Sequence, residues 1–351
     1  MPKKRKTWRV MLVSKEVAIM AGCVACALIA VQFQPAASTV DDVLPALSTA
    51  VMVGQQTTEQ QQPASLQSML MKVAQYYHAS PINPRVDSVW KLIPGLNGVQ
   101  LNLAATLDAA KKYPNQIPLV FQQIPPNLSM QDFVAEPIYR GNPQKRQMAL
   151  MINVAWGTEY LPKILSILKS NHVMATFFLD GSWTKKNPEE AKAIVADGME
   201  VGSHAYNHPM MSRLSRSQMI SQLSRTNAAI AEATGQKVSL FAPPSGDFNN
   251  LVVQVASGMK MRTILWTLDT IDWRKPNPSV IVSRIVNKRT PGALVLMHPT
   301  APTVQALPEL IALLKKDGYQ LVTVSQLLSS ERPVPQTLAQ AQQEMSRVSK
   351  N

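Results

Sequence analysis

Three of the five histidines in this 351-residue chain follow apolar runs, at spacings that suit metal binding or proton transfer. His204 and His208 stand four residues apart with one turn between them, so both imidazoles can reach one metal ion. His298 directly follows the apolar run 294–297, a suitable place for a general acid or base. The same spacing also fits histidines on a surface or bonded within a core, so the pattern alone leaves both readings open.

A second group of polar residues is the motif DTIDW at 269–273, which also follows an apolar run. It supplies a carboxylate that could orient an imidazole such as that of His298. The alternative for Asp272 is a structural one, in which its side chain caps a helix or a turn.

The elements that must position these residues begin near residue 147, where short apolar runs alternate with helical patterns. The predicted strands are Met148–Val154, Ala175–Leu179, Glu200–Ser203, Leu240–Ala242, Thr263–Leu268, Ala293–Met297 and Gln320–Val322. The predicted helices are Leu161–Leu168, Pro188–Ala196, Ser217–Ala233, Leu251–Met259, Val280–Val286 and Pro308–Leu314. Strict alternation predicts an α/β fold with a parallel sheet covered by helices. An open doubly wound sheet and a short (β/α) barrel both fit, and both place function at the carboxyl ends of the strands.

Taken in order, these segments resemble the polysaccharide deacetylase family, the NodB-homology domain of carbohydrate esterase family four. The similarity covers about residues 149–328 and rests on GSHAYNHP at 202–209, DTIDW at 269–273 and LMH at 296–298. The resemblance implies a distorted, incomplete (β/α) barrel of about seven strands. It also implies a divalent metal, usually zinc, that activates water for attack on an N-acetyl group of an amino sugar.

The resemblance assigns a role to each matching position. His204 and His208 would bind the metal, His298 would protonate the leaving amine, and Asp269 would tune His298. The substrate and oxyanion positions would be Pro243, Trp273 and Ser245, the last through its backbone N–H.

Two motifs depart from the family pattern. Where the family has the base and the third metal ligand, both aspartates, this chain has Asn153 and Val154. The arginine that holds the base is replaced by Ala242. An amide has no titratable acceptor near neutral pH and an isopropyl group cannot bind a cation. Losing a positioned base typically costs about 10² to 10⁴ in rate. Substitute carboxylates at predicted loop tops are Asp180, the best placed, and Glu159 and Asp247, which are more typical of solvated loop charges.

The motif NVAWG at 153–157, with the segments 84–95 and 137–143, narrows the resemblance to the YlxY-type branch associated with endospore formers. That branch implies sporulation or cell-wall biology. Two functions follow as alternatives: weak or altered hydrolysis of N-acetyl groups on peptidoglycan or a related glycan, and binding of a glycan or a wall-assembly partner without turnover.

The composition excludes several classes. Hydrophobic residues make up 46% of the chain and charged residues 16%, which excludes a charge-driven disordered protein. The net charge is +13, but residues 1–16 carry +5 of it, and the remaining +8 is too dilute to indicate nucleic-acid binding.

The first 65 residues resemble targeting and spacer sequence. The basic segment 1–16 and the apolar segment 17–33 predict a signal or an uncleaved anchor, with the body outside the membrane. Both cysteines, Cys23 and Cys26, fall in that segment, so the predicted body has no disulfide. A flexible spacer (34–65), a small α/β accessory unit (66–137), the deacetylase-like domain (138–330) and a tail (331–351) complete the predicted organisation. Within the accessory unit we expect a helix at 66–77, a strand at 99–103, a helix at 105–112 and a strand at 118–122.

Overall fold

The computed structural model describes residues 65–348. The basic segment 1–16, the apolar segment 17–33 and nearly all of the spacer lie outside the described residues, so their predictions stay predictions. Among residues 65–348, no helix combines the length and the apolar character needed to cross a bilayer.

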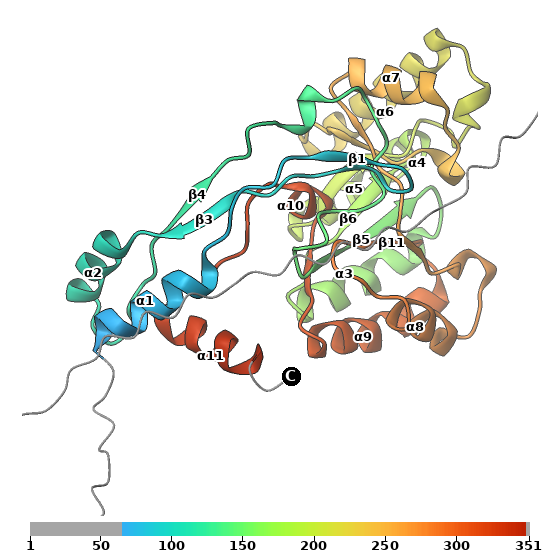
Figure 1. Ribbon diagram of the computed structural model, residues 1–351. Helices are drawn as coiled ribbons and strands as arrows, with labels where there is room; N and C mark the ends of the chain where they lie inside the picture. Colours follow the sequence, from blue (N-terminus) through green and yellow to red (C-terminus); the bar gives the residue numbers. More distant parts are fainter. Residues whose placement is uncertain (1–64, 349–351) are drawn as a thin grey trace, which may run out of the picture. The chain divides into compact units, whose positions relative to one another are not determined.

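The main element is a curled parallel sheet (Figure 1). Seven strands run in the order β10-β11-β5-β6-β7-β8-β9, and β12 pairs with the first half of β5. Their bounds are β5 Gln147–Val154, β6 Thr176–Leu179, β7 Glu200–Ser203, β8 Leu240–Phe241, β9 Arg262–Thr263, β10 Leu268–Asp269, β11 Leu294–Met297 and β12 Gln320–Val322. The α/β prediction is confirmed, and the sheet curls as an incomplete barrel does.

Helices cover the outer face of this sheet. α8 (Pro278–Val286), α9 (Ala301–Lys316) and α3 (Leu161–Ser170) are neighbours along one stretch, and α5 (Pro188–Ala196), α6 (Arg216–Thr234) and α7 (Asn250–Gly258) along the other (Figure 1). All eight residues of β5 are buried, as expected for a parallel strand packed on both faces. Its alternate residues join different cores: Ile152 packs in the cluster that includes the helices, and Met151 in the cluster inside the barrel.

One predicted strand is wrong in its bounds. The apolar run 263–268 forms two short strands, β9 and β10, because the chain between them leaves the sheet to meet the segment 138–140. Ile264 bridges to Ile138, and the Thr267 hydroxyl donates a hydrogen bond to the Tyr139 carbonyl. The apolar pattern of 263–268 does not indicate that the segment 138–140 pairs with it and forms part of the barrel wall.

A second cluster forms from α1 (Leu66–Tyr77), β3 (Gly98–Leu101), α2 (Leu103–Lys112), β4 (Phe121–Ile124) and α11 (Leu338–Val348) (Figure 1). The strand predicted at 118–122 begins later, at Phe121, because the Leu119 N–H bonds to the Gln336 carbonyl instead. The residues predicted as a tail contain α11, which packs on α1. The Tyr77 hydroxyl donates to the Glu344 carboxylate at 2.8 Å across that contact.

Besides α11, two β-strands and two α-helices of the described residues have no counterpart among the sequence predictions. They are the hairpin of β1 (Arg85–Asp87) and β2 (Lys91–Ile93) and the short helices α4 (Gly181–Lys186) and α10 (Val324–Leu328). Each is too short for its apolar period to be read from the sequence. α9 is also longer than predicted, because the helix continues through Pro308 instead of beginning there.

A buried lysine closes the end of α10. The Lys145 ammonium donates to the carbonyls of Gln326 at 2.8 Å and Ser329 at 3.0 Å, and burial lowers the pKa of Lys145 to about 8. Lys145→Met leaves these carbonyls without their donor while relieving the cost of the buried charge, so we expect a net loss of about 2 kcal/mol in unfolding free energy. Urea denaturation measures this. The control is Lys169→Met, which removes an exposed ion-pair partner of Asp197 and should cost under about 1 kcal/mol. Equal losses of unfolding free energy in the two variants would contradict the capping role of Lys145.

Candidate active site

The carboxyl ends of neighbouring strands bring the motif residues to one edge of the sheet. β11 pairs with β5 so that Met297 lies opposite Ile152, which places His298 and Asn153 at adjacent strand ends. β7 pairs with β8 so that Ser203 lies opposite Phe241, and the next residues, His204 and Ala242, touch. The parallel sheet therefore gathers residues that are far apart in the sequence.

The histidine pair has a defined arrangement. The His204 Nδ1 lies 2.8 Å from the Ala242 carbonyl, and because a carbonyl only accepts, Nδ1 carries the proton and Nε2 the lone pair. The His204 and His208 rings meet edge to face with centroids 5.2 Å apart. Burial, together with the neighbouring His208, lowers the pKa of His204 to about 3. His204 is thus neutral, with one nitrogen free to act as a ligand.

A third ligand is missing from this arrangement. Val154 is fully buried in the apolar cluster that contains Ile152 and Leu161, so its position offers no donor atom. Residues 65–348 contain no group of three or more His, Cys, Asp or Glu side chains that could hold a metal ion. Catalytic zinc sites use three protein ligands, and two imidazoles do not make such a set. The described residues therefore supply two of the three protein ligands that the resemblance implies for a metal ion.

Two of the three candidate substitute carboxylates, Asp180 and Asp247, already accept hydrogen bonds from other residues. Asp180 caps α4: its Oδ1 accepts from the backbone N–H groups of Ser182 and Trp183 at 2.8 and 2.9 Å. Burial raises the pKa of Asp180, and its Oδ2 meets no partner at hydrogen-bond geometry, although the backbone N–H of His208 lies near enough to favour the carboxylate. Asp247 accepts two hydrogen bonds from Ser212, and Glu159 is exposed.

Position 153, where the resemblance to the family expects the base, holds a buried amide. Asn153 is 4% exposed, and its Oδ1 has no hydrogen-bond partner in the described part of the chain. Ala242 is fully buried, so no guanidinium occupies the place of the family's arginine. A buried oxygen atom that lacks a hydrogen-bond donor can accept a hydrogen bond from a hydroxyl or an amide N–H of a ligand.

His298 is held by Asp272. Its Nδ1 lies 2.8 Å from Oδ1 of Asp272, and its backbone N–H donates to Oδ2 of the same carboxylate. Oδ2 also accepts from the Thr303 hydroxyl at 2.6 Å. Asp272 is fully buried, and within the described residues its carboxylate bonds only to His298 and Thr303. These contacts fit the orienting alternative, whereas no capping bond from its side chain to a helix or turn is present among those residues.

Four further site residues were predicted: Asp269, Trp273, Pro243 and Ser245. Asp269 accepts from the Ile271 N–H, and burial raises the pKa of Asp269, but it makes no hydrogen bond to His298 in the described structure. Trp273 is 48% exposed, Pro243 is buried, and Ser245 is exposed with a left-handed backbone (φ 55°). Their roles stay predictions.

Sequence reasoning assigned no role to Trp156. Its ring stacks on the His298 ring with an interplanar angle of 6° and centroids 5.9 Å apart, and it is 45% exposed. The motif NVAWG contained it, but only the β5–β11 pairing shows that it covers the imidazole.

Asp272→Asn tests the orienting carboxylate. The amide nitrogen would face N–H donors, so we expect about 2 to 3 kcal/mol less stability and loss of the Nδ1–H···O bond of His298. Denaturation gives the free energy, and imidazole nitrogen chemical shifts report the tautomer. Asp269→Asn should cost far less, because burial already favours its neutral form. A similar cost for the two variants would contradict the assignment.

The sequence is similar to a family model and to several known proteins. The sequence model described as "Polysaccharide deacetylase" matches residues 140–264. The chain is 45% identical over 265 residues to the uncharacterized protein YlxY of Bacillus subtilis (strain 168), covering 75% of this chain and 83% of that protein. It is 35% identical over 187 residues to the peptidoglycan-N-acetylmuramic acid deacetylase PdaC of the same organism, covering 53% of this chain but only 39% of PdaC.

Among solved structures, the chain is similar to wild-type BA3943, described as a CE4 family pseudoenzyme from Bacillus anthracis. The identity is 44% and the TM-score 0.71, with coverage of 77% of this chain and 97% of that one. A mutant of BA3943, described as having restored enzymatic activity, matches with the same identity and TM-score and covers 76% and 99% of the two chains.

Proposed function

Because the chain belongs to the polysaccharide deacetylase family, we propose that it binds a cell-wall glycan of the peptidoglycan type at the carboxyl edge of its sheet without hydrolysing N-acetyl groups. The observation that carries the proposal is the base position, where the buried amide of Asn153 has no neighbouring guanidinium and no titratable acceptor. The fully buried Val154 removes the third ligand at the same place.

The same edge retains features that suit sugar binding. Trp156 and Trp273 are both about half exposed and present apolar faces beside polar groups. The Asn153 Oδ1 is an acceptor still without a donor. Peptidoglycan is named in relatives such as PdaC, which supports a glycan of that class as the ligand.

A second candidate is weak or altered hydrolysis at the same site. The hydrogen bond between Asp272 and His298 favours it, because it keeps a general acid oriented, and His204 keeps a free nitrogen. This candidate needs a divalent metal, for which His204 and His208 would supply two donors.

The proposal extends to the place of action. The basic and apolar residues 1–33 support a body held or released outside the membrane, near its glycan. The branch resemblance supports a role in sporulation or in wall assembly.

The experiment compares binding and turnover in one preparation of the full chain. We expect N-acetylglucosamine oligomers to bind, Trp156→Ala to weaken that binding about tenfold, and acetate release to stay at the level of the buffer. Tyr113→Ala, which removes an exposed aromatic side chain from the end of α2, is the matched control and should bind normally. Metal-dependent acetate release by the wild-type chain would exclude binding without turnover and establish the second candidate.

A further inference from the structure

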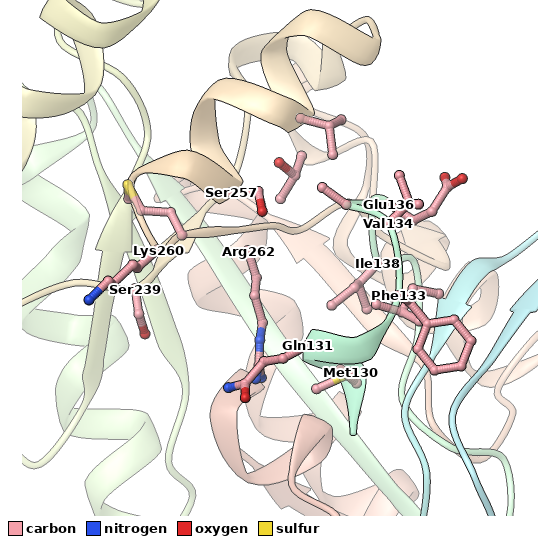
Figure 2. Close-up of a pocket in the computed structure, with 15 residues that line it drawn as sticks. Met130, Gln131, Phe133, Val134, Glu136, Ile138, Ser239, Ser257, Lys260 and Arg262 are labelled. Atoms are coloured by element: carbon pink, nitrogen blue, oxygen red, sulfur yellow. The ribbon is translucent and has the colours of Figure 1, made fainter. Parts of the chain in front are cut away.

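A pocket of about 660 Å³ lies at the amino ends of β8 and β9, the opposite edge of the sheet from the candidate active site (Figure 2). The connection into β9, the end of α7 and the segment 130–138 form its walls. None of the sequence-predicted site residues lines it. Its volume falls within the usual range for small-molecule sites, and the proposed function does not depend on it.

The pocket contains a cation without a partner. Arg262, the first residue of β9, extends its guanidinium into the pocket toward Gln131 and Met130 (Figure 2). The side chain is half-buried, and within residues 65–348 it makes no hydrogen bond or ion pair. Burial lowers the pKa of Arg262, and no neighbouring acid opposes that effect. An arginine presents five N–H donors in a planar fork that matches a carboxylate or a phosphate.

The other residues that line the pocket indicate the charge and polarity of a ligand that would fit. Glu136 is the one acid among the lining residues, and its carboxylate points away from Arg262 (Figure 2). Lys260 adds a second positive charge at the rim, while Phe133 and Ile138 supply an apolar wall. The pocket therefore combines an unneutralised guanidinium with apolar surface.

We propose that this pocket binds an anionic group, a carboxylate or a phosphate, carried by a partly apolar molecule, with Arg262 as its main contact. The guanidinium would form paired, charge-assisted hydrogen bonds to the anion, and the apolar wall would pack against the rest of the ligand. The anion comes from one of two sources: the carboxylate of an acidic sugar or peptide, or the phosphate of an anionic polymer.

Calorimetric titration of the full chain at low salt distinguishes these sources. The carboxylate arm compares N-acetylmuramic acid with N-acetylglucosamine, which lacks the lactyl group. The phosphate arm compares glycerol 3-phosphate with glycerol. Each pair therefore differs by the group that carries the anion. We expect one acid to bind, its neutral partner to bind at least tenfold more weakly, and Arg262→Gln to weaken the acid about tenfold or more. Arg216→Gln, at the exposed start of α6, should leave binding unchanged. Absence of binding by both acids, or equal binding by Arg262→Gln, would overturn the proposal.

Stability provides a second readout that separates a ligand contact from a structural one. Because Arg262 is half-buried and unpaired, Arg262→Met should leave the unliganded chain as stable as the wild type or more stable. The bound acid should raise the melting temperature of the wild type and not that of Arg262→Met. A lower melting temperature of unliganded Arg262→Met would show that the arginine serves the fold and would contradict the ligand role.

Discussion

The triple variant Asn153→Asp, Val154→Asp, Ala242→Arg is expected to release acetate from N-acetylglucosamine oligomers about 10² to 10⁴ times faster than the background release measured with the wild-type chain. The first change returns a titratable acceptor to the end of β5, beside His298, which Asp272 already orients. The third returns the arginine that the resemblance to the family assigns to holding that carboxylate.

The second change, Val154→Asp, makes the result depend on metal. Val154 is fully buried in an apolar cluster, so an aspartate there carries a desolvated charge unless a cation neutralises it. We therefore expect one zinc per chain in the triple variant and a melting temperature that rises when zinc is added.

The control is the double variant Asn153→Asp, Ala242→Arg, which retains Val154. It should bind zinc more weakly and release little acetate, because only His204 and His208 remain as ligands. Zinc stoichiometry and acetate release measure both points. If the double variant matched the triple variant in both, the third-ligand assignment of position 154 would be wrong.

The second large effect concerns the loop that carries Trp156. Gly157 has a φ of +76°, and a Cβ at this position would lie 2.1 Å from the Pro299 carbonyl oxygen. Gly157→Ala therefore combines left-handed strain with a clash against backbone, which cannot move aside as a flexible side chain does. We expect a loss of about 3 to 5 kcal/mol and displacement of Trp156 from the His298 ring.

Gly198→Ala separates the two causes. Gly198 has a similar φ of +80°, but a Cβ there meets nothing within 4 Å. It should cost only about 1 kcal/mol, the strain of the backbone conformation. Chemical denaturation of both variants gives the difference. Losses that agreed within error would mean that the contact with Pro299 has no energetic weight.

Much of the site could be predicted because parallel alternation constrains where strands end. Once 148–154, 200–203 and 293–297 were read as strands, His204, His298 and Asn153 had to lie at one edge of the sheet. The identity of the replaced residues, an amide and an isopropyl group, is chemistry that the sequence states directly. The strand read through 263–268 was wrong because Ile138 and Tyr139, more than a hundred residues earlier, draw the intervening chain out of the sheet.

The sequence by itself determined the α/β class, because the short-range apolar period encodes it. The candidate site residues and the replacement at the base position came from the resemblance to the family. Only the tertiary structure decided which carboxylate holds His298, how Asp180 is used, and where α11 packs. It also decided that Arg262 points unpaired into a pocket on the other edge of the sheet. These outcomes depend on contacts between distant segments, whose geometry follows from packing and hydrogen-bond satisfaction over the whole fold and from no local pattern.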